Sequence, residues 1–448
     1  MSFKIPVLRR TLQCGDAAMF ACLMLALCCN AASSVPFEAG VARVSITPLE
    51  ENIPTQLGGY GAREGKPAEG VLDTLYGKVL ALRQGDVQCV LITVDACGVP
   101  VNLAEETLVK AGIPGLTLDN TLICASHSHT GLEGFALDRR NIADNPNIGV
   151  FSEPMLNFVV DRLAGALKQA CDKMEPVTAA SGVVALPGMN RNRRDAACVD
   201  EQLTVLRLDR QDGTPLAALV NFTAHGTIVD ETDMLASGEW AGQMQRTVED
   251  YIGGGVTCLY TNGAEGDIAP RRPEGGSHYE QAQNYGRQVG LAAARLIEGL
   301  QGAEVSAFAR KCAWATLPPR KGAPDFLKIA GDEYKVSAEQ LDLLLQVMFP
   351  DTAPLYALRI NDFAMITFPG EPICAIGTAV KDALRAEGIK HPCVASLTTD
   401  AIGYILTTEE YARSGYEVTA SFYGDGLGTL LLEEASKLAI TVAGADMK

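Results

Sequence analysis

Hydrophobic and polar residues follow two patterns along the chain, and together these predict a protein of mixed strands and helices. Short apolar runs bounded by turn residues predict strands at 41–46, 76–82, 89–94, 121–124, 204–208, 216–222, 256–260, 355–360 and 364–368. Apolar positions that recur every three or four residues predict helices at 103–111, 154–174, 279–300, 338–347, 373–386 and 428–443. This alternation is typical of an α/β fold with helices flanking a β-sheet core.

Two turn signals indicate that the sheet is mixed rather than all parallel. Gln211-Asp212-Gly213 and Asn361-Asp362 each join two predicted strands closely enough to form a hairpin. Hairpins pair strands antiparallel, whereas strands separated by helices tend to pair in parallel. Because ligands of such folds collect at strand ends, we expect the functional site there.

The first 34 residues have the pattern of an export signal. A basic start with Lys4, Arg9 and Arg10 precedes an apolar segment at 17–29 and a small-residue cleavage region at 30–34. We therefore expect the protein to be exported, to the periplasm or the medium, after cleavage. A lipoprotein anchor at Cys28 or Cys29 is less favoured, because a small residue should precede the lipidated cysteine.

Residues 35–448 contain neither a Pro/Ser-rich linker nor an internal repeat, which predicts one continuous domain. The predicted signal is too short to span a bilayer comfortably, and no later run approaches the roughly 20 apolar residues of a transmembrane helix. We therefore expect no transmembrane segment, with peripheral membrane contact left open. The oligomeric state cannot be predicted from these patterns.

The charge balance argues against nucleic acid as a partner. The 448-residue chain has 37 Lys and Arg against 54 Asp and Glu, a formal net charge of −17. The predicted signal has three basic residues and Asp16, so its removal takes the net charge from −17 to −19. Such a chain lacks the basic surface that binding to phosphates requires, and an anionic membrane would repel it on average.

The cysteines do not predict a metal knuckle or a disulfide framework. Four of the thirteen lie in the first 34 residues, which leaves nine. Several of these, including Cys89, Cys124 and Cys258, lie in apolar strand-like runs, where cysteine behaves as a small hydrophobe. There is no C-x-x-C pair.

Three of the five histidines follow apolar strands. His127 and His129 lie two residues apart after the strand at 121–124, and His225 follows the strand at 216–222. Residues i and i+2 of an extended segment point to the same side, so both imidazoles of the pair can ligate one ion, or one can ligate while the other transfers protons. This pattern predicts a metal site at strand ends.

Five short segments follow one another along the chain. They are Ala125-Ser126-His127-Ser128-His129-Thr130-Gly131, Asn190-Arg191, Ala224-His225-Gly226-Thr227, Phe368-Pro369-Gly370-Glu371 and Gly403-Tyr404-Ile405-Leu406-Thr407-Thr408-Glu409-Glu410-Tyr411. In this order they resemble the motifs A-T-H-T-H-S-G, N-R, V-H-G-T, P-G-E-F and Y-x-T-T-x-E-E-Y of the neutral/alkaline ceramidases, zinc amidases that cleave the N-acyl bond of ceramide. The resemblance runs from Gly40 to about Tyr423.

The resemblance implies a set of roles for these residues. His127, His225, Glu371 and Tyr404 would hold Zn²⁺, an N/O donor set that suits this ion. Zinc would activate a water molecule and polarise the scissile carbonyl. The implied catalytic residues are His129 as general base, Arg191 holding the carbonyl oxygen, and Asp267, which reads equally well as a turn residue. The implied substrate is ceramide or a related lipid-like N-acyl amide.

Two departures from the family pattern affect the substrate more than the chemistry. Ala269 stands in Gly266-Asp267-Ile268-Ala269-Pro270 where the family has a serine, and the chain stops where longer members continue into a C-terminal β domain. The alternatives are therefore a zinc hydrolase of a different amide or ester, and a non-catalytic binding protein that retains the metal site. Asp95 is a candidate to orient a ligand. Ser237-Gly238-Glu239 favours a helix cap over a carboxylate near the site, and we expect His278 and His391 on the surface.

Overall fold

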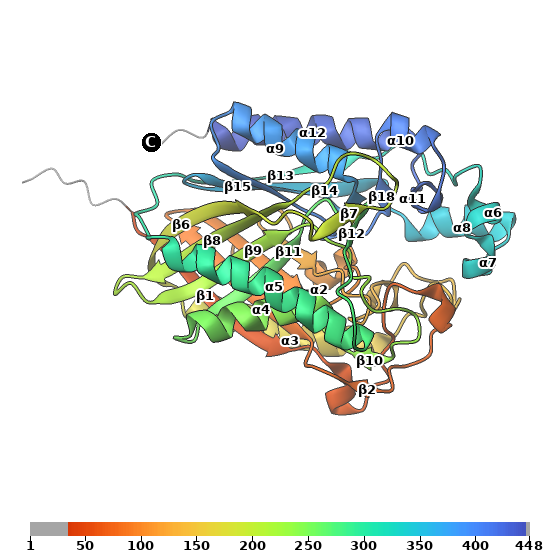
Figure 1. Ribbon diagram of the computed structural model, residues 1–448, viewed down its shortest axis with the longest axis horizontal. Helices are drawn as coiled ribbons and strands as arrows, with labels where there is room; N and C mark the ends of the chain where they lie inside the picture. Colours follow the sequence, from red (N-terminus) through yellow and green to blue (C-terminus); the bar gives the residue numbers. More distant parts are fainter. Residues whose placement is uncertain (1–34, 445–448) are drawn as a thin grey trace, which may run out of the picture. The chain divides into compact units, whose positions relative to one another are not determined.

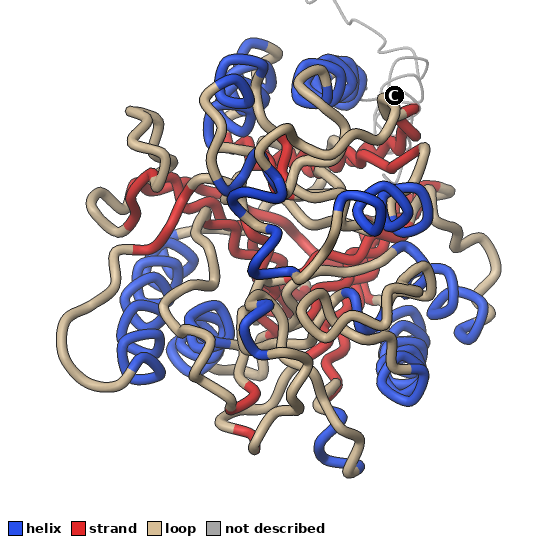
Figure 2. Tube along the Cα trace, turned by 90° about the vertical axis from the view of Figure 1, so that its right-hand side faces the viewer, coloured by secondary structure: helices blue, strands red, loops and turns tan. Residues whose placement is uncertain are grey.

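Two β-sheets stack face to face, and helices cover the outer face of each (Figure 1). The computed structural model describes residues 35–444, and the residues from Phe37 onward form one unit. The predicted export signal lies outside the described residues. Figure 2, turned by 90°, shows the strands of the core between helices above and below.

The large sheet has eight strands and the small sheet four. In spatial order the large sheet contains β11 (Thr257–Asn262), β9 (Pro215–Phe222), β8 (Gln202–Arg210), β6 (Glu175–Ala185), β1 (Phe37–Ser45), β3 (Tyr76–Gln84), β4 (Val87–Val94) and β5 (Thr121–Ala125). The small sheet contains β13 (Phe308–Thr316), β14 (Thr352–Ile360), β15 (Phe363–Thr367) and β17 (His391–Ala395). Three two-stranded pairs lie outside them: β2 (Gly70–Val71) with β10 (Leu235–Ala236), β7 (Asn190–Asn192) with β12 (Ile268–Pro270), and β16 (Glu371–Pro372) with β18 (Tyr404–Ile405).

The mixed sheet predicted from the sequence is confirmed. Both predicted turns close antiparallel hairpins, β8–β9 and β14–β15, while β4–β5, β9–β11 and β15–β17 pair in parallel. The sequence analysis expected one sheet, and the structure has two. The strands of both sheets are buried on their inner faces, so their apolar runs do not reveal which sheet each joins.

Alternating side chains of each strand fill two different layers. In β3, Leu80 and Leu82 pack toward the small sheet, whereas Val79 and Ala81 pack toward the helices. Helices α2 (Val101–Ala111), α3 (Glu153–Asp172), α4 (Glu239–Ile252) and α5 (His278–Gly299) cover the large sheet, and α9 (Cys374–Ala386) and α12 (Leu427–Ala443) cover the small one. Within residues 35–444, no helix is long and apolar enough to cross a membrane.

Short helices gather with the long loops at the right of Figure 1. These are α6 (Phe326–Ile329), α7 (Gly331–Tyr334), α8 (Ala338–Met348), α10 (Thr408–Ala412) and α11 (Tyr416–Thr419), with 3₁₀ turns η1 (Pro48–Glu51), η2 (Gly61–Arg63) and η3 (Phe135–Leu137) elsewhere. The edge strands β5 and β11 of the large sheet contact each other. This contact brings the loops after β5 and β9 together, although the two strands are far apart in the sheet order.

Candidate metal centre and active site

Four side chains from four separate segments converge on one buried point. The carboxylate oxygen Oε2 of Glu371 lies 3.4 Å from Nε2 of His127 and 3.3 Å from Nε2 of His225. The phenol oxygen of Tyr404 lies 3.3 Å from the same Nε2 of His225. The ligand atoms of His127, His225 and Glu371 all lie within 4.8 Å of one another. The structure thus brings together the four residues that the family resemblance implies as metal ligands.

Backbone pairing explains why these side chains meet. Ser128 forms a parallel bridge with Gly226, which joins the two histidine loops. A side chain at Gly226 would place its Cβ against the backbone oxygen of His127, so only glycine permits this approach. Glu371 and Tyr404 are direct partners in the parallel pair β16–β18. Each pair of ligands is therefore fixed by its own short bridge.

The two ligand histidines are oriented by hydrogen bonds to backbone carbonyls. Nδ1 of His127 lies 2.7 Å from the oxygen of Cys97, and Nδ1 of His225 lies 2.9 Å from the oxygen of Glu265. Because a carbonyl only accepts, each Nδ1 carries the proton and each Nε2 lone pair faces the common point. His127 also adopts a left-handed backbone with φ of 61°, an unfavourable conformation of the kind that clusters at functional sites.

His129 lies beside the cluster with its ring held by neighbours. Its Nε2 is 3.3 Å from Nε2 of His127, and its ring meets the ring of Tyr60 edge-on at 4.9 Å. Burial, followed by the charges of the neighbouring histidines, holds the pKa of His129 well below its usual range. His129 is thus neutral near pH 7 and able to accept a proton.

The structure does not bring Arg191 into the cluster. Arg191 is exposed at the middle of β7, opposite Ala269 of β12, and no hydrogen bond or ion pair of the described residues involves its guanidinium. Its neighbours Asn190 and Asn192 are buried instead, because successive side chains of a strand point to opposite faces. This placement does not support the expected contact of Arg191 with a substrate oxygen.

Arg193 is the arginine that contacts the cluster. Its Nη2 donates to the phenol oxygen of Tyr404 and to the backbone oxygen of Gly266, both at 2.8 Å. Its Nε lies 2.8 Å from a carboxylate oxygen of Glu417. Burial lowers the pKa of Arg193, but Tyr404, Glu417 and Glu371 outweigh this and raise it, so the side chain stays charged. Arg193 therefore orients Tyr404 and supplies positive charge behind it.

Asp267 supports the site without touching the cluster. Its carboxylate accepts from the backbone nitrogen of Cys374 and from Nδ2 of Asn192, both at 2.7 Å. Its position gives it a positioning role, because it ties β7 to the first residue of α9. A disulfide between Cys198 and Cys374 joins the loop after β7 to the same end of α9, and the two cysteines are 176 positions apart. This disulfide was not predicted from the cysteine spacing.

Glu265 is a buried carboxyl group that the sequence analysis did not single out. It is fully buried, and neither of its oxygens makes a hydrogen bond. Burial, followed by the charge of Glu371, raises the pKa of Glu265 well above its usual range. Burial thus favours the protonated form of the side chain, and the backbone oxygen of Glu265 orients His225.

The other candidates lie outside the cluster. Asp95 accepts from the backbone of Tyr76 at 2.8 Å, and Oε1 of Glu239 accepts from the backbone of Ile228 at 3.0 Å. Glu239 is the first residue of α4, but its carboxylate supports the loop after His225 instead of capping its own helix. His278 is half-buried between Asp230 and Asp233, and His391 is half-buried against Ser181.

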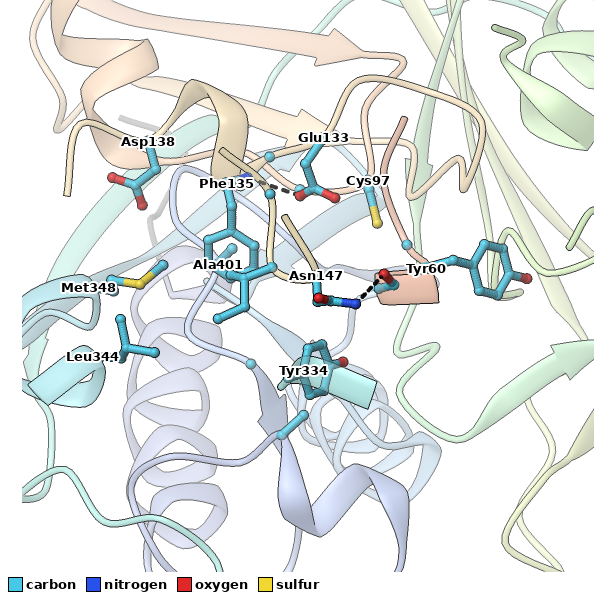
Figure 3. Close-up of a pocket in the computed structure, with 18 of the residues that line it drawn as sticks. Tyr60, Cys97, Glu133, Phe135, Asp138, Asn147, Tyr334, Leu344, Met348 and Ala401 are labelled. Atoms are coloured by element: carbon cyan, nitrogen blue, oxygen red, sulfur yellow. Dashed lines mark hydrogen bonds between the residues drawn. The ribbon is translucent and has the colours of Figure 1, made fainter. Parts of the chain in front are cut away.

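A pocket of about 210 Å³ is lined by the cluster and by apolar side chains. Figure 3 shows Tyr60, Cys97 and Glu133 on one side and Leu344 and Met348 on the other. The further apolar lining residues include Phe135, Leu341, Leu345, Phe349 and Phe422. A pocket with polar groups at one side and an apolar wall at the other suits a ligand with a reactive polar group and a hydrocarbon chain.

The residues present fit a zinc ion. Oε2 of Glu371 is buried and makes no conventional hydrogen bond, although two imidazole nitrogens face it. Two neutral imidazoles, one carboxylate and one phenol oxygen form an N/O donor set of the kind that binds Zn²⁺. An unpaired buried carboxylate oxygen is costly, and a cation at this point would relieve that cost. The fold and this site define the class: an α/β protein with a buried His–His–Glu–Tyr cluster whose donor atoms fit a metal ion.

Comparison with known proteins agrees with this class. The chain is 22% identical to neutral ceramidase of Pseudomonas aeruginosa, over 91% of this chain and 72% of that protein. It is 21% identical to neutral ceramidase B of Dictyostelium discoideum, over 79% of this chain and 65% of that protein. The crystal structure of the Pseudomonas aeruginosa enzyme matches the fold with a TM-score of 0.77 at 19% identity, covering 92% of this chain and 75% of that one. A structure titled as ceramidase complexed with C2 matches with a TM-score of 0.73 at 20% identity, covering 91% and 75%.

No protein-family model matches the chain. The similarity to the curated relatives nevertheless extends over most of its length, and the structural likeness covers the same region. Both comparisons agree with the resemblance of its motifs to the neutral ceramidases.

Proposed function

We propose that the chain is a zinc-dependent amidohydrolase that cleaves the N-acyl bond of ceramide or a related lipid amide. The convergence of His127, His225, Glu371 and Tyr404 carries this proposal. Its similarity to neutral ceramidases supports the reaction class. Hydrolysis of long-chain N-acyl amides by the purified, metal-replete protein tests it, and a protein that binds zinc but hydrolyses no amide or ester would be a binding protein instead.

Zinc at this point would supply an activated water molecule and polarise the scissile carbonyl. The protein's own residues fix the geometry for this chemistry. The backbone carbonyls of Cys97 and Glu265 hold the two ligand imidazoles in one tautomer. Arg193 holds the phenol of Tyr404 and favours negative charge on its oxygen.

His129 is positioned to move protons next to the reacting atoms. It is neutral and buried, and its Nε2 points toward the cluster. We assign to it the removal of a proton from the attacking water and the later delivery of a proton to the leaving amine. Gly59 makes room for its ring, because a Cβ there would overlap the imidazole.

The apolar side of the pocket supports a lipid-like substrate. Leu341, Leu344, Leu345 and Met348 of α8 line this side and suit an acyl or alkyl chain. Ceramide enters the proposal through the names of the relatives. A non-ceramide amide or an ester remains the second candidate, because Ala269 stands where the family has a serine.

Export to the periplasm or the medium stays a proposal that rests on the first 34 residues. The N-terminal sequence of the protein recovered from its natural host tests it. We expect the mature chain to begin near residue 35.

Separate substitutions of Arg191 and Arg193 should distinguish the roles of these two arginines. We expect Arg193→Lys to lower zinc affinity or turnover by about 10- to 100-fold, because lysine cannot bond to Tyr404 and Glu417 with the same fork. Arg191→Ala should change turnover by less than about threefold, because Arg191 is exposed and unbonded. A 100-fold loss confined to Arg191→Ala would restore the role that the resemblance implies for it.

Position 269 tests whether a serine is required for catalysis. We expect the natural protein to hydrolyse N-acyl amides, and Ala269→Ser to change kcat/KM by no more than about 150-fold, because a buried hydroxyl costs or contributes about 1–3 kcal/mol. Kinetics of both forms with equal zinc content check this. Activity found only in Ala269→Ser would show that the serine is the essential nucleophile and would overturn the water-based mechanism.

A further inference from the structure

A carboxylate that the proposed chemistry does not use projects into the pocket. Glu133 is half-buried, and its Oε1 accepts a hydrogen bond of 3.0 Å from the backbone nitrogen of Phe135 (Figure 3). Among residues 35–444, no ion pair involves its side chain. Burial raises the pKa of Glu133 to about 7, against the lowering effect of the amides of Phe135, Gly59 and Gly134. Above about pH 7 the wall of the pocket thus offers a fixed, ionised acceptor without a counterion.

Arg63 is the positively charged side chain that affects Glu133 most, but its hydrogen bonds go to other groups. Arg63 lowers the pKa of Glu133 through space, yet its guanidinium donates to the backbone oxygens of Gly58, His129 and Asp230 at 2.6, 2.5 and 3.0 Å. Arg63 therefore serves the loops around the site and leaves the Glu133 carboxylate available to a ligand.

Glu133 lies between the cluster and the apolar wall. Gly59, whose amide acts on Glu133, packs directly against the ring of His129. Cys97, on the same side of the pocket in Figure 3, holds His127 through its backbone oxygen. Leu344 and Met348 lie on the opposite side. A group bound by Glu133 would therefore be close to the scissile bond and not at the end of an alkyl chain.

We propose that Glu133 determines head-group specificity by accepting a hydrogen bond from a donor of the substrate, a hydroxyl or an ammonium group near the scissile amide. This inference rests on the proposed function and adds a substrate class to it: N-acyl amines that carry such a donor. An ionised carboxylate only accepts, so a substrate without a donor would displace water from Glu133 and leave it unpaired. The site discriminates through this difference.

Three amides with the same acyl chain and the same alkyl length test the proposal. The first carries a hydroxyl group on the amine part, near the amide nitrogen. The second carries an ammonium group at the same position, and the third carries neither group. We expect the natural protein to favour a donor-bearing amide by about 10- to 100-fold in kcat/KM, the range for a hydrogen bond to a charged group. Glu133→Ala should bring this ratio close to one, mainly through KM. Glu133→Gln should keep part of the preference for the hydroxyl, because its amide oxygen still accepts a hydrogen bond. It should lose the preference for the ammonium group, because the negative charge is gone.

The matched control is Glu105→Gln, a change on the exposed side of α2 that should leave the ratio intact. Equal kcat/KM for the three amides in the natural protein, or a preference that survives in Glu133→Ala, overturns the inference and leaves the proposed function standing. If none of the amides is hydrolysed, the proposed function fails, and calorimetry with the same amides decides on Glu133 alone. The inference then holds only if a donor-bearing amide binds at least about tenfold more tightly than the plain one and Glu133→Ala removes the difference.

Discussion

Replacing His225 by alanine is expected to empty the metal centre and abolish hydrolysis. His225 is almost fully buried, and its Nε2 faces both Glu371 and Tyr404 at 3.3 Å. The variant would keep His127, Glu371 and Tyr404 but lose the ligand that faces both Glu371 and Tyr404. We expect bound zinc after dialysis to fall from about one per chain to below about 0.1, and turnover to fall by about 10³ or more, since metal activation contributes several kcal/mol.

His391→Ala is the matched control, because His391, in β17 of the small sheet, contacts Ser181 of β6 and not the centre. It should retain zinc and turnover. Elemental analysis and kinetics of both purified variants give the answer. Full zinc content in His225→Ala would remove His225 from the ligand set, whatever its effect on activity.

The second large effect is expected at His129, where binding and catalysis should separate. His129 faces His127 at 3.3 Å, and its Nδ1 is buried without a hydrogen bond. Because His127 is the member of this pair that also faces Glu371, His129→Ala should keep the zinc and lower turnover by about 10² to 10³, the effect of losing a proton-transfer group. His127→Ala should lose the zinc.

Zinc content and single-turnover rates measured on the same preparations distinguish the two histidines. His278→Ala, which alters a histidine paired with Asp230 and Asp233, controls for the loss of an imidazole elsewhere. If His129→Ala loses the metal and His127→Ala retains it, the ligand and base roles of the pair must be exchanged.

The long elements could be predicted because their pattern directly reflects burial. All nine predicted strands and all six predicted helices are present, with ends shifted by a few residues. Strands β6, β13 and β17 and helix α4 were not among the predicted elements, and in β6 and β13 partly exposed positions interrupt the apolar pattern. The stacking of two sheets could not be predicted, since a strand buried on both faces looks alike in either sheet.

The histidine pair was predicted to meet for a reason that the structure corrects. Strand β5 ends at Ala125, and His127 adopts a left-handed backbone, so strand alternation does not place the two rings together. A turn brings the Nε2 atoms of His127 and His129 to within 3.3 Å of each other. The bridge between Ser128 and Gly226 places His225 next to them. The motifs identified the residues, but the sequence contained no signal for this local geometry.

Arg193 and the disulfide show what sequence patterns leave open. In Asn190-Arg191-Asn192-Arg193 every second residue is an arginine, and only the end of β7 at Asn192 frees Arg193 to turn toward Tyr404. Cys198 and Cys374 are 176 positions apart, so no local spacing predicts their pairing. Both depend on contacts between distant segments.

The central claim is that His127, His225, Glu371 and Tyr404 hold one zinc ion that supports amide hydrolysis. The most direct measurement is the release of fatty acid from a long-chain N-acyl amide by protein stripped with a chelator and titrated with Zn²⁺. The account predicts no hydrolysis by the stripped protein and activity that rises in proportion to bound zinc, ending at about one ion per chain. Hydrolysis that persists without metal, or none at one bound zinc per chain, would contradict it.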